Sequence, residues 1–94
     1  MSRCTIEKFN SIKNALKQVD IELDKLKMKR DTANNVGNNL KKINEKIDFM
    51  CLLEFNHPSA MYIYSQLQPA AAQASIRGAS STALKLIPHV KDLL

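Results

Sequence analysis

The stretch that decides the fold is residues 9–26, FNSIKNALKQVDIELDKL. Its large apolar side chains recur at alternating steps of three and four residues, the a/d pattern of a helix that packs along one stripe. No Pro or Gly interrupts residues 1–36, and Thr5 is a residue type that caps helix N-termini. The sequence therefore predicts a long helix over residues 4–32. Its stripe consists of Phe9, Ile12, Leu16, Val19, Leu23 and Leu26.

A second apolar stripe has the same steps, but its register is displaced by three residues from the first. The Asn-rich segment 34–39 lies between the two stripes and contains residues that favour turns and helix ends. This pattern predicts an antiparallel hairpin whose second helix covers residues 39–55. The alternative is one long helix with a kink at Gly37. The second stripe consists of Val36, Leu40, Ile43, Ile47 and Met50.

Residues 56–94 differ in composition, because no charged residue occurs from Asn56 to Ile76. Pro58 and Pro69 each stand where a helix can begin, which predicts short helices over 58–67 and 69–77. Gly78 ends the second of these, and a last helix begins at Ser80 or Ser81 and bends or restarts at Pro88. The small side chains of Ala70, Ala71, Ala72 and Ala74 would let a neighbouring helix backbone come close. We predict an all-α fold in which residues 1–94 form one domain.

The predicted first helix is too long for a compact monomer. Its 28 or so residues would rise about 42 Å, whereas a compact globule of this size is about 32 Å across. An overhanging apolar stripe would be exposed, so we expect a second copy to cover it. The stripe from Phe9 to Leu26 is thus predicted to be the seam of a homo-oligomer, most simply a dimer. Ile21 and Met28 form a thin second strip that is either tolerated at the surface or contacts residues 56–94.

Basic residues outnumber acidic ones by 14 to 9, giving a net charge of +5. On a helical wheel, several cations of the first helix gather opposite the apolar stripe, where a dimer would present them as a basic strip. No aromatic residue is interleaved with them, which argues against reading of single strands. The strip suggests duplex nucleic-acid binding as an alternative to a merely solvated face. The candidate residues are Arg3, Lys13, Lys17, Lys25 and Lys29.

Several chemistries lack the residues they require. Two glycines cannot form a glycine-rich phosphate loop, so nucleotide cofactors of that kind are excluded. Cys4 and Cys51 are predicted to be free thiols, and with His57 and His89 they lack the close pairs of a metal site. His57, next to Pro58, is expected at a helix entry and His89 at the surface. No nucleophile, base and oxyanion donor can be combined, so we expect no catalytic residue, no cofactor and no small-molecule substrate.

No apolar segment is long enough to span a membrane, and charges near the N-terminus argue against a signal peptide, so we expect a cytoplasmic protein with no membrane partner. In shape alone, a basic helical dimer is similar to the duplex-RNA-binding silencing suppressors of insect nodaviruses, and a hairpin with a proline break resembles type III secretion needle and rod subunits. No motif of this chain carries either likeness, and architecture does not imply function. The sequence predicts a non-enzymatic helical protein that self-associates and binds a macromolecular partner, or else duplex RNA or DNA.

Overall fold

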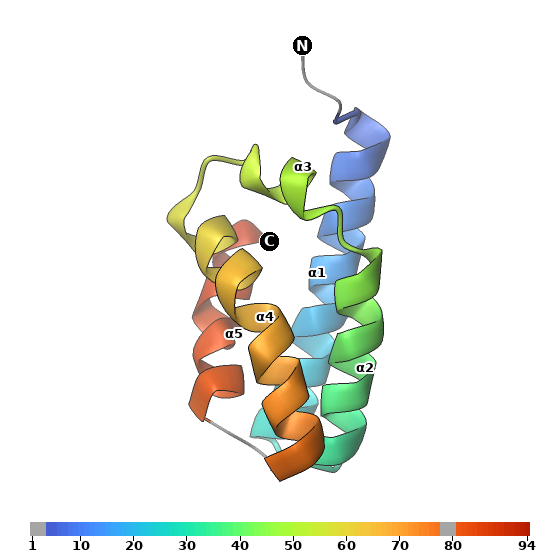
Figure 1. Cartoon of the computed structure of the whole chain (residues 1–94), viewed down its shortest axis with the longest axis vertical. Coiled ribbons are helices and arrows are strands. Elements are labelled where there is room, and N and C mark those ends of the chain that lie inside the picture. Colours follow the sequence, from blue (N-terminus) through green and yellow to red (C-terminus); the bar gives the residue numbers. More distant parts are fainter. Residues whose placement is uncertain (1–3, 78–80) are drawn as a thin grey trace.

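The computed structural model describes residues 4–77 and 81–94, which fold into helices packed as a bundle (Figure 1). The all-α class predicted from the sequence is confirmed. The four longer helices alternate in direction, and the short α3 lies in the connection between α2 and α4. No helix in this part of the chain combines the length and the apolar character needed to cross a membrane. The helices are α1 (Ile6–Lys27), α2 (Ala33–Lys46), α3 (Phe49–Leu53), α4 (Pro58–Arg77) and α5 (Ser81–Leu93).

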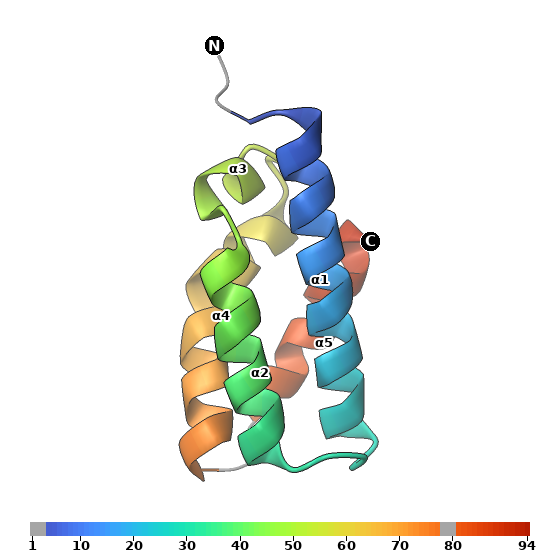
Figure 2. The same ribbon diagram turned by 90° about the vertical axis from the view of Figure 1, so that its right-hand side faces the viewer.

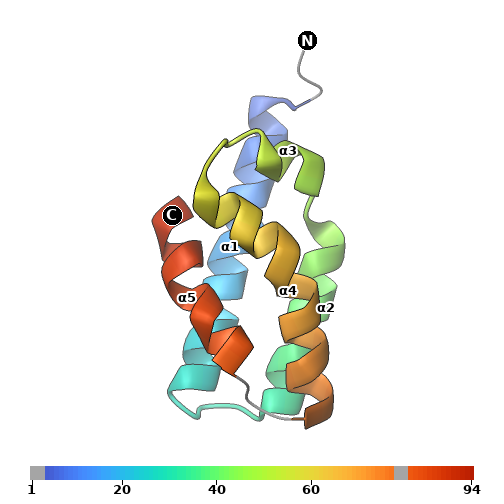
Figure 3. The same ribbon diagram turned by 60° about the vertical axis from the view of Figure 1, so that its left-hand side comes forward.

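The four long helices occupy the corners of the bundle. Helices α1 and α4 each pack against both α2 and α5, so α1 and α4 lie at opposite corners. Figures 2 and 3 show this arrangement, with α4 in front of the bundle and α1 behind it in Figure 3. Consequently the outer face of α1 and the outer face of α4 point to opposite sides of the molecule.

The antiparallel hairpin of the first two long helices is present, but its turn is not where the sequence placed it. Helix α1 ends at Lys27, and Lys29 adopts a left-handed conformation (φ 55°) that lets the amide of Arg30 donate to the carbonyl of Lys25 at 2.9 Å. Helix C-termini with this bond usually carry Gly at the left-handed position. A lysine there gave no indication in the sequence that the helix ends. Thr32 then caps α2 by accepting a hydrogen bond from the amide of Asn35. The segment 34–39 is therefore helical, and the predicted range 39–55 is wrong at both ends, because α2 ends at Lys46 and residues 49–53 form the separate helix α3.

Pro58 begins α4 as expected, whereas Pro69 and Pro88 lie inside helices. Helix α4 runs through Pro69, so the predicted short helices 58–67 and 69–77 are one helix of 20 residues. Helix α5 likewise continues through Pro88. Buried side chains on both sides of Pro69, at Leu67 and Ala70, hold the two halves in line against the core. Gly78 and Ser80 lie outside the described residues.

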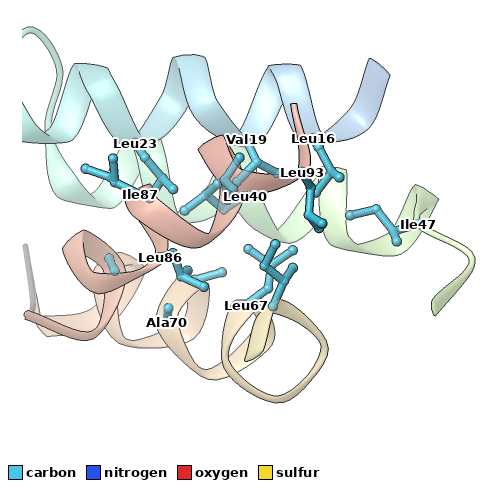
Figure 4. Packing of buried hydrophobic residues seen from close by; sticks show 14 of the residues in the cluster. Leu16, Val19, Leu23, Leu40, Ile47, Leu67, Ala70, Leu86, Ile87 and Leu93 are labelled. Atoms are coloured by element: carbon cyan, nitrogen blue, oxygen red, sulfur yellow. The ribbon is translucent and has the colours of Figure 1, made fainter. Parts of the chain in front are cut away.

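The apolar stripe of α1 is buried within a single chain, which corrects its assignment as an oligomer seam. Leu16, Val19 and Leu23 are fully buried by the other helices, and Phe9 packs on Phe55 with ring centroids 5.3 Å apart. Side chains of all four long helices meet them in the core (Figure 4). The overhang disappears because α1 has 22 residues, a rise of about 33 Å, and the molecule is 42 Å long. The remaining stripe residues, Ile12 and Leu26, are buried as well.

The prediction of two free thiols is wrong. Cys4 and Cys51 form a disulfide whose Cα atoms are 5.5 Å apart, joining the segment before α1 to α3. The pairing connects residues 47 positions apart, so spacing in the sequence could not show it. Because disulfides persist mainly in oxidising compartments, this bond removes one support for the expected cytoplasmic location.

Helices α2 and α4 approach each other most closely at Gly37. A Cβ atom at this position would lie 2.8 Å from the carbonyl oxygen of Ala71 and 2.9 Å from the carbonyl carbon of Ala74, and it would also collide with the amide nitrogen of Ser75. The side-chain amide of Asn34 donates to the carbonyl of Ser75 at 2.6 Å beside this contact. Gly37 thus allows backbone-to-backbone packing against the alanine side of α4, as the predicted close approach at the alanines requires.

We predict that Gly37→Ala destabilises the protein although alanine favours helices by about 1 kcal/mol. The added methyl group meets backbone atoms, which cannot rotate away, so we expect the free energy of unfolding to fall by about 2 kcal/mol. Urea denaturation followed by circular dichroism measures this change. The control is Asn38→Ala, at an exposed position of the same helix, where stability should be unchanged or slightly raised. Equal stabilisation by both substitutions would contradict the close α2–α4 contact.

Candidate functional site

The structure divides the candidate nucleic-acid residues into free and engaged cations. Lys13 and Lys17 are exposed on α1, and Lys29 is exposed in the turn that follows it. None of these three forms an ion pair with a described residue. Lys25 forms an ion pair with Glu22. Arg3 lies outside the described residues. The predicted strip is therefore shorter than the helical wheel suggested.

Lys25 serves the fold, because it neutralises a buried carboxylate. Its Nζ donates to Oε2 of Glu22 at 2.9 Å, and the side-chain amide of Asn39 donates to Oε1 of Glu22 at 2.8 Å. The hydrogen bond and the negative charge of Glu22 raise the pKa of Lys25 above its ordinary value. Only 6% of the Glu22 surface is exposed, and a buried charge needs such partners. Lys25 is thus committed to the α1–α2 contact.

Two acidic residues on the flank of α1 are paired with α5. Nζ of Lys91 lies 3.0 Å from Oδ1 of Asp20 and 3.8 Å from Oδ2 of Asp24. The hydrogen bond to Asp20 raises the pKa of Lys91. These exposed ion pairs contribute little to stability. Along the edge between α1 and α5, these positive and negative charges are therefore paired. The unpaired cations of α1 lie on its outer side and at its C-terminal end.

From Pro58 to Ile76 the outer side of α4 is an exposed surface without charged residues. Met61 is 63% exposed, Tyr64 52% and Ile76 78%, and between Asn56 and Ile76 the chain contains no Asp, Glu, Lys or Arg. A helix on the surface of a soluble protein normally carries charged residues on its outer side. We call this surface the α4 face. Its α4 residues are Met61, Tyr64, Ser65, Gln68, Ala72 and Ile76.

Helix α3 extends the α4 face at one end. The rings of Phe49 and Tyr64 are 5.6 Å apart and tilted by 57°. Met50, the next residue, is 60% exposed. Aromatic residues and methionine are enriched in protein interfaces, where charged residues are depleted in the core of the contact. Phe49 and Met50 are therefore included in the α4 face.

A small hollow with an unsatisfied acceptor borders the α4 face. The hollow has a volume of ≈ 190 Å³ between α2 and α4 and is lined in part by Asn44 and Gln68. Oδ1 of Asn44 is buried and receives no hydrogen bond from any described residue. A buried acceptor without a donor costs about 1–3 kcal/mol.

Charged residues line the edge of the same hollow. Lys41 and Glu45 of α2 stand beside it. A polar rim around an uncharged centre is the usual composition of a protein–protein interface. The α4 face thus has such a rim along its α2 side.

A Ser, a His and an Asp meet between α4 and α5, a cluster that the sequence analysis missed. The hydroxyl of Ser59 donates to Oδ2 of Asp92 at 3.0 Å, and Nδ1 of His89 is also 3.0 Å from this hydroxyl oxygen. Because the hydroxyl proton is donated to Asp92, Nδ1 of His89 carries the hydrogen of the other bond. In a hydrolytic triad the imidazole lies between serine and carboxylate, whereas here the serine lies between them. With 3% of Ser59 exposed, the cluster is a polar link between two helices.

The histidines are placed partly as expected. Nδ1 of His57 accepts a hydrogen bond from the amide of Ser59 at 3.0 Å, so His57 is the predicted helix-entry residue. His89 is not a free surface side chain, because its ring stacks on Tyr62 with centroids 3.9 Å apart. The spacing of His89 and Asp92, three residues apart on one helix, was the only sequence signal for this cluster. Among the described residues no three His, Cys, Asp or Glu side chains converge as metal ligands.

An open hollow of ≈ 440 Å³ lies where the α3–α4 connection meets α1 and α5. Its floor contains the Phe9–Phe55 pair, and its walls carry charges of both signs. This mixture fits no single class of small molecule, unlike the convergent polar groups of a specific site. The lining residues are Phe9, Lys13, Glu54, Phe55, His57, Asp92 and Leu93.

Comparison with known proteins identifies no relative of this chain. No protein-family model matches the chain, and no curated protein or solved structure is significantly similar to it.

Proposed function

We propose that this protein acts by self-association and macromolecular binding, and that it pairs through the α4 face. The observation that carries the proposal is the exposed, uncharged side of α4 with Met61, Tyr64 and Ile76 at its surface. Because the α1 stripe is buried within the chain, the α4 face replaces it as the surface available to a second copy.

The charge distribution permits contact between two copies at the α4 face. The chain carries a net charge of +5, so most pairings of its surfaces would bring like charges together. The α4 face avoids this repulsion, because no charged side chain lies within it. A protein that recruits an acidic partner would instead be expected to use its cationic surface for steering.

The exposed amide of Gln68 lies on the α4 face and can both donate and accept a hydrogen bond. In a two-fold dimer the same groups face each other in both directions, so this amide can pair with its own copy. The bundle is 42 Å long and 21 Å wide, and the α4 face with its rim along α2 occupies one side of it, where a standard interface needs roughly 800 Å² per partner.

Tyr64→Lys is expected to weaken the dimer. A lysine on each copy places two cations in the centre of the contact, where charge is poorly solvated. We expect the dissociation constant measured by sedimentation velocity to rise at least a hundredfold, which corresponds to about 2.7 kcal/mol.

Ile21→Lys is the matched control. It introduces the same side chain at an exposed apolar position of α1, on the opposite side of the bundle. The control should dimerise as the wild type does. A wild-type protein that remains monomeric at 100 µM or so, far above the range of a specific dimer, would rule the proposal out.

Duplex nucleic-acid binding is a second candidate, supported by the free cations of α1 and of its C-terminal turn. Lys27, Lys29 and Arg30 are exposed there within four residues, with no ion pair to a described residue. Two acids, Asp24 and Asp31, line a hollow together with Arg30. Asp31 accepts hydrogen bonds from the side chain of Asn35 and the amide of Thr32, which lower its pKa. Since α1 and α4 lie at opposite corners, a dimer formed through the α4 face leaves this basic end accessible.

We predict that, if this candidate is correct, the triple variant Lys27→Ala, Lys29→Ala, Arg30→Ala binds duplex RNA more weakly than Lys85→Ala, a control on α5. Each lost phosphate contact reduces the slope of log affinity against log salt by about 0.9. A gel-shift titration with duplex RNA and duplex DNA at several salt concentrations measures both quantities. The absence of any shift at micromolar protein, or equal slopes for the two variants, would reject nucleic-acid binding through these residues.

A further inference from the structure

The Cys4–Cys51 disulfide attaches one edge of the α4 face to the rest of the molecule. Cys51 is the central residue of α3, and it directly follows Met50, which contributes to the α4 face. Its side chain is buried, with 1% exposed. The position of Phe49 and Met50 against α4 therefore depends on the element that this disulfide anchors.

Besides the disulfide, α3 is held by the burial of Leu52, by the ring contact between Phe49 and Tyr64, and by a cap at Asp48. It contains five residues, and helices this short do not persist on their own in water. Leu52 is fully buried, and Oδ1 of Asp48 accepts a hydrogen bond from the amide of Cys51 at 3.2 Å. The ion pair between Lys8 and Asp48 is 3.8 Å long and solvent-exposed, so it contributes little.

We propose that the redox state of this disulfide controls self-association, an inference that rests on pairing through the α4 face. In the oxidised protein α3 is held beside α4, and Phe49 and Met50 complete the contact surface. In the reduced protein α3 detaches locally, and the α4 face loses these two side chains. Local opening of weakly attached elements, with the rest of the fold intact, is common in native proteins.

The chemical step is thiol–disulfide exchange with a dithiol reductant. Cys4 is only half-buried, whereas Cys51 is enclosed, so the reductant's thiolate attacks Sγ of Cys4 and the Sγ of Cys51 leaves as a thiolate. The second thiol of the reductant then displaces Cys4 from the mixed disulfide. Two electrons pass to the protein, two protons complete its thiols, and the reductant becomes a cyclic disulfide.

The test is the dissociation constant of the dimer, measured by sedimentation velocity with the chain fully oxidised and fully reduced by dithiothreitol. We expect reduction to raise the dissociation constant at least tenfold. Hydrogen–deuterium exchange on the same samples should show faster exchange at residues 49–55 and unchanged protection in α2, α4 and α5. Global loss of protection on reduction would overturn the local mechanism.

Two variants separate this inference from the proposed function. Cys4→Ser with Cys51→Ala should resemble the reduced protein under both conditions, and alanine avoids a buried hydroxyl at position 51. Phe49→Ala with Met50→Ala should weaken the oxidised dimer to the level of the reduced wild type and should respond little to reductant. A wild-type dimer of equal affinity in both redox states would refute the redox control and leave self-association standing, whereas absence of an oxidised dimer would refute self-association itself.

Discussion

The backbone contact between α2 at Gly37 and α4 at Ala71–Ser75 is the constraint on which the rest of the structure depends. It brings the small side of α4 against the bundle, so that Ala70, Ala71 and Ala74 are fully buried. Met61, Tyr64 and Ile76, on the other side of the same helix, then point outward. Because the alanine side of α4 packs within the chain, the opposite side of the helix is the one left exposed.

The same constraint explains why the stripe of α1 needs no second copy. With α4 held close to α2, α5 closes the remaining side of the bundle and covers Leu16, Val19 and Leu23 from within. An a/d pattern of leucine and isoleucine indicates that a helix is covered along one stripe, but it does not distinguish a partner helix in the same chain from one in another chain. The basic outer side of α1 and the uncharged outer side of α4 are left on opposite sides of the molecule, where they can act independently.

Much of the fold could be predicted from local patterns, and the differences arise where tertiary packing overrides them. The stripe from Phe9 to Leu26 gave the first helix and the hairpin, because helical periodicity is a local property. The turn was misplaced because Gly37 looked like a helix end, whereas its role is a contact with a helix more than 30 residues away. Pro69 looked like a helix start because proline is common at that position. The buried residues on both sides of it keep α4 continuous. The disulfide depends on a distance in space that sequence spacing does not contain.

The sequence indicated the α4 face only through its lack of charged residues. The absence of charge from Asn56 to Ile76 is typical of a segment that encloses a core. That interpretation holds for Ile63 and Leu67, which are fully buried, and fails for Met61 and Tyr64, which are mostly exposed. Composition cannot assign a side to each residue of a helix that, up to Ile76, has no charged side chains to mark its outer side.

The α1 stripe is covered inside the chain, and we propose that the α4 face meets a second copy. A dilution series of amide NMR spectra of the oxidised protein tests it most directly, because every residue reports separately. The account predicts concentration-dependent shifts at residues 49–50 and along the outer side of α4, with the amides of residues 12–26 unchanged. Shifts confined to α1, or spectra that do not depend on concentration, would contradict it.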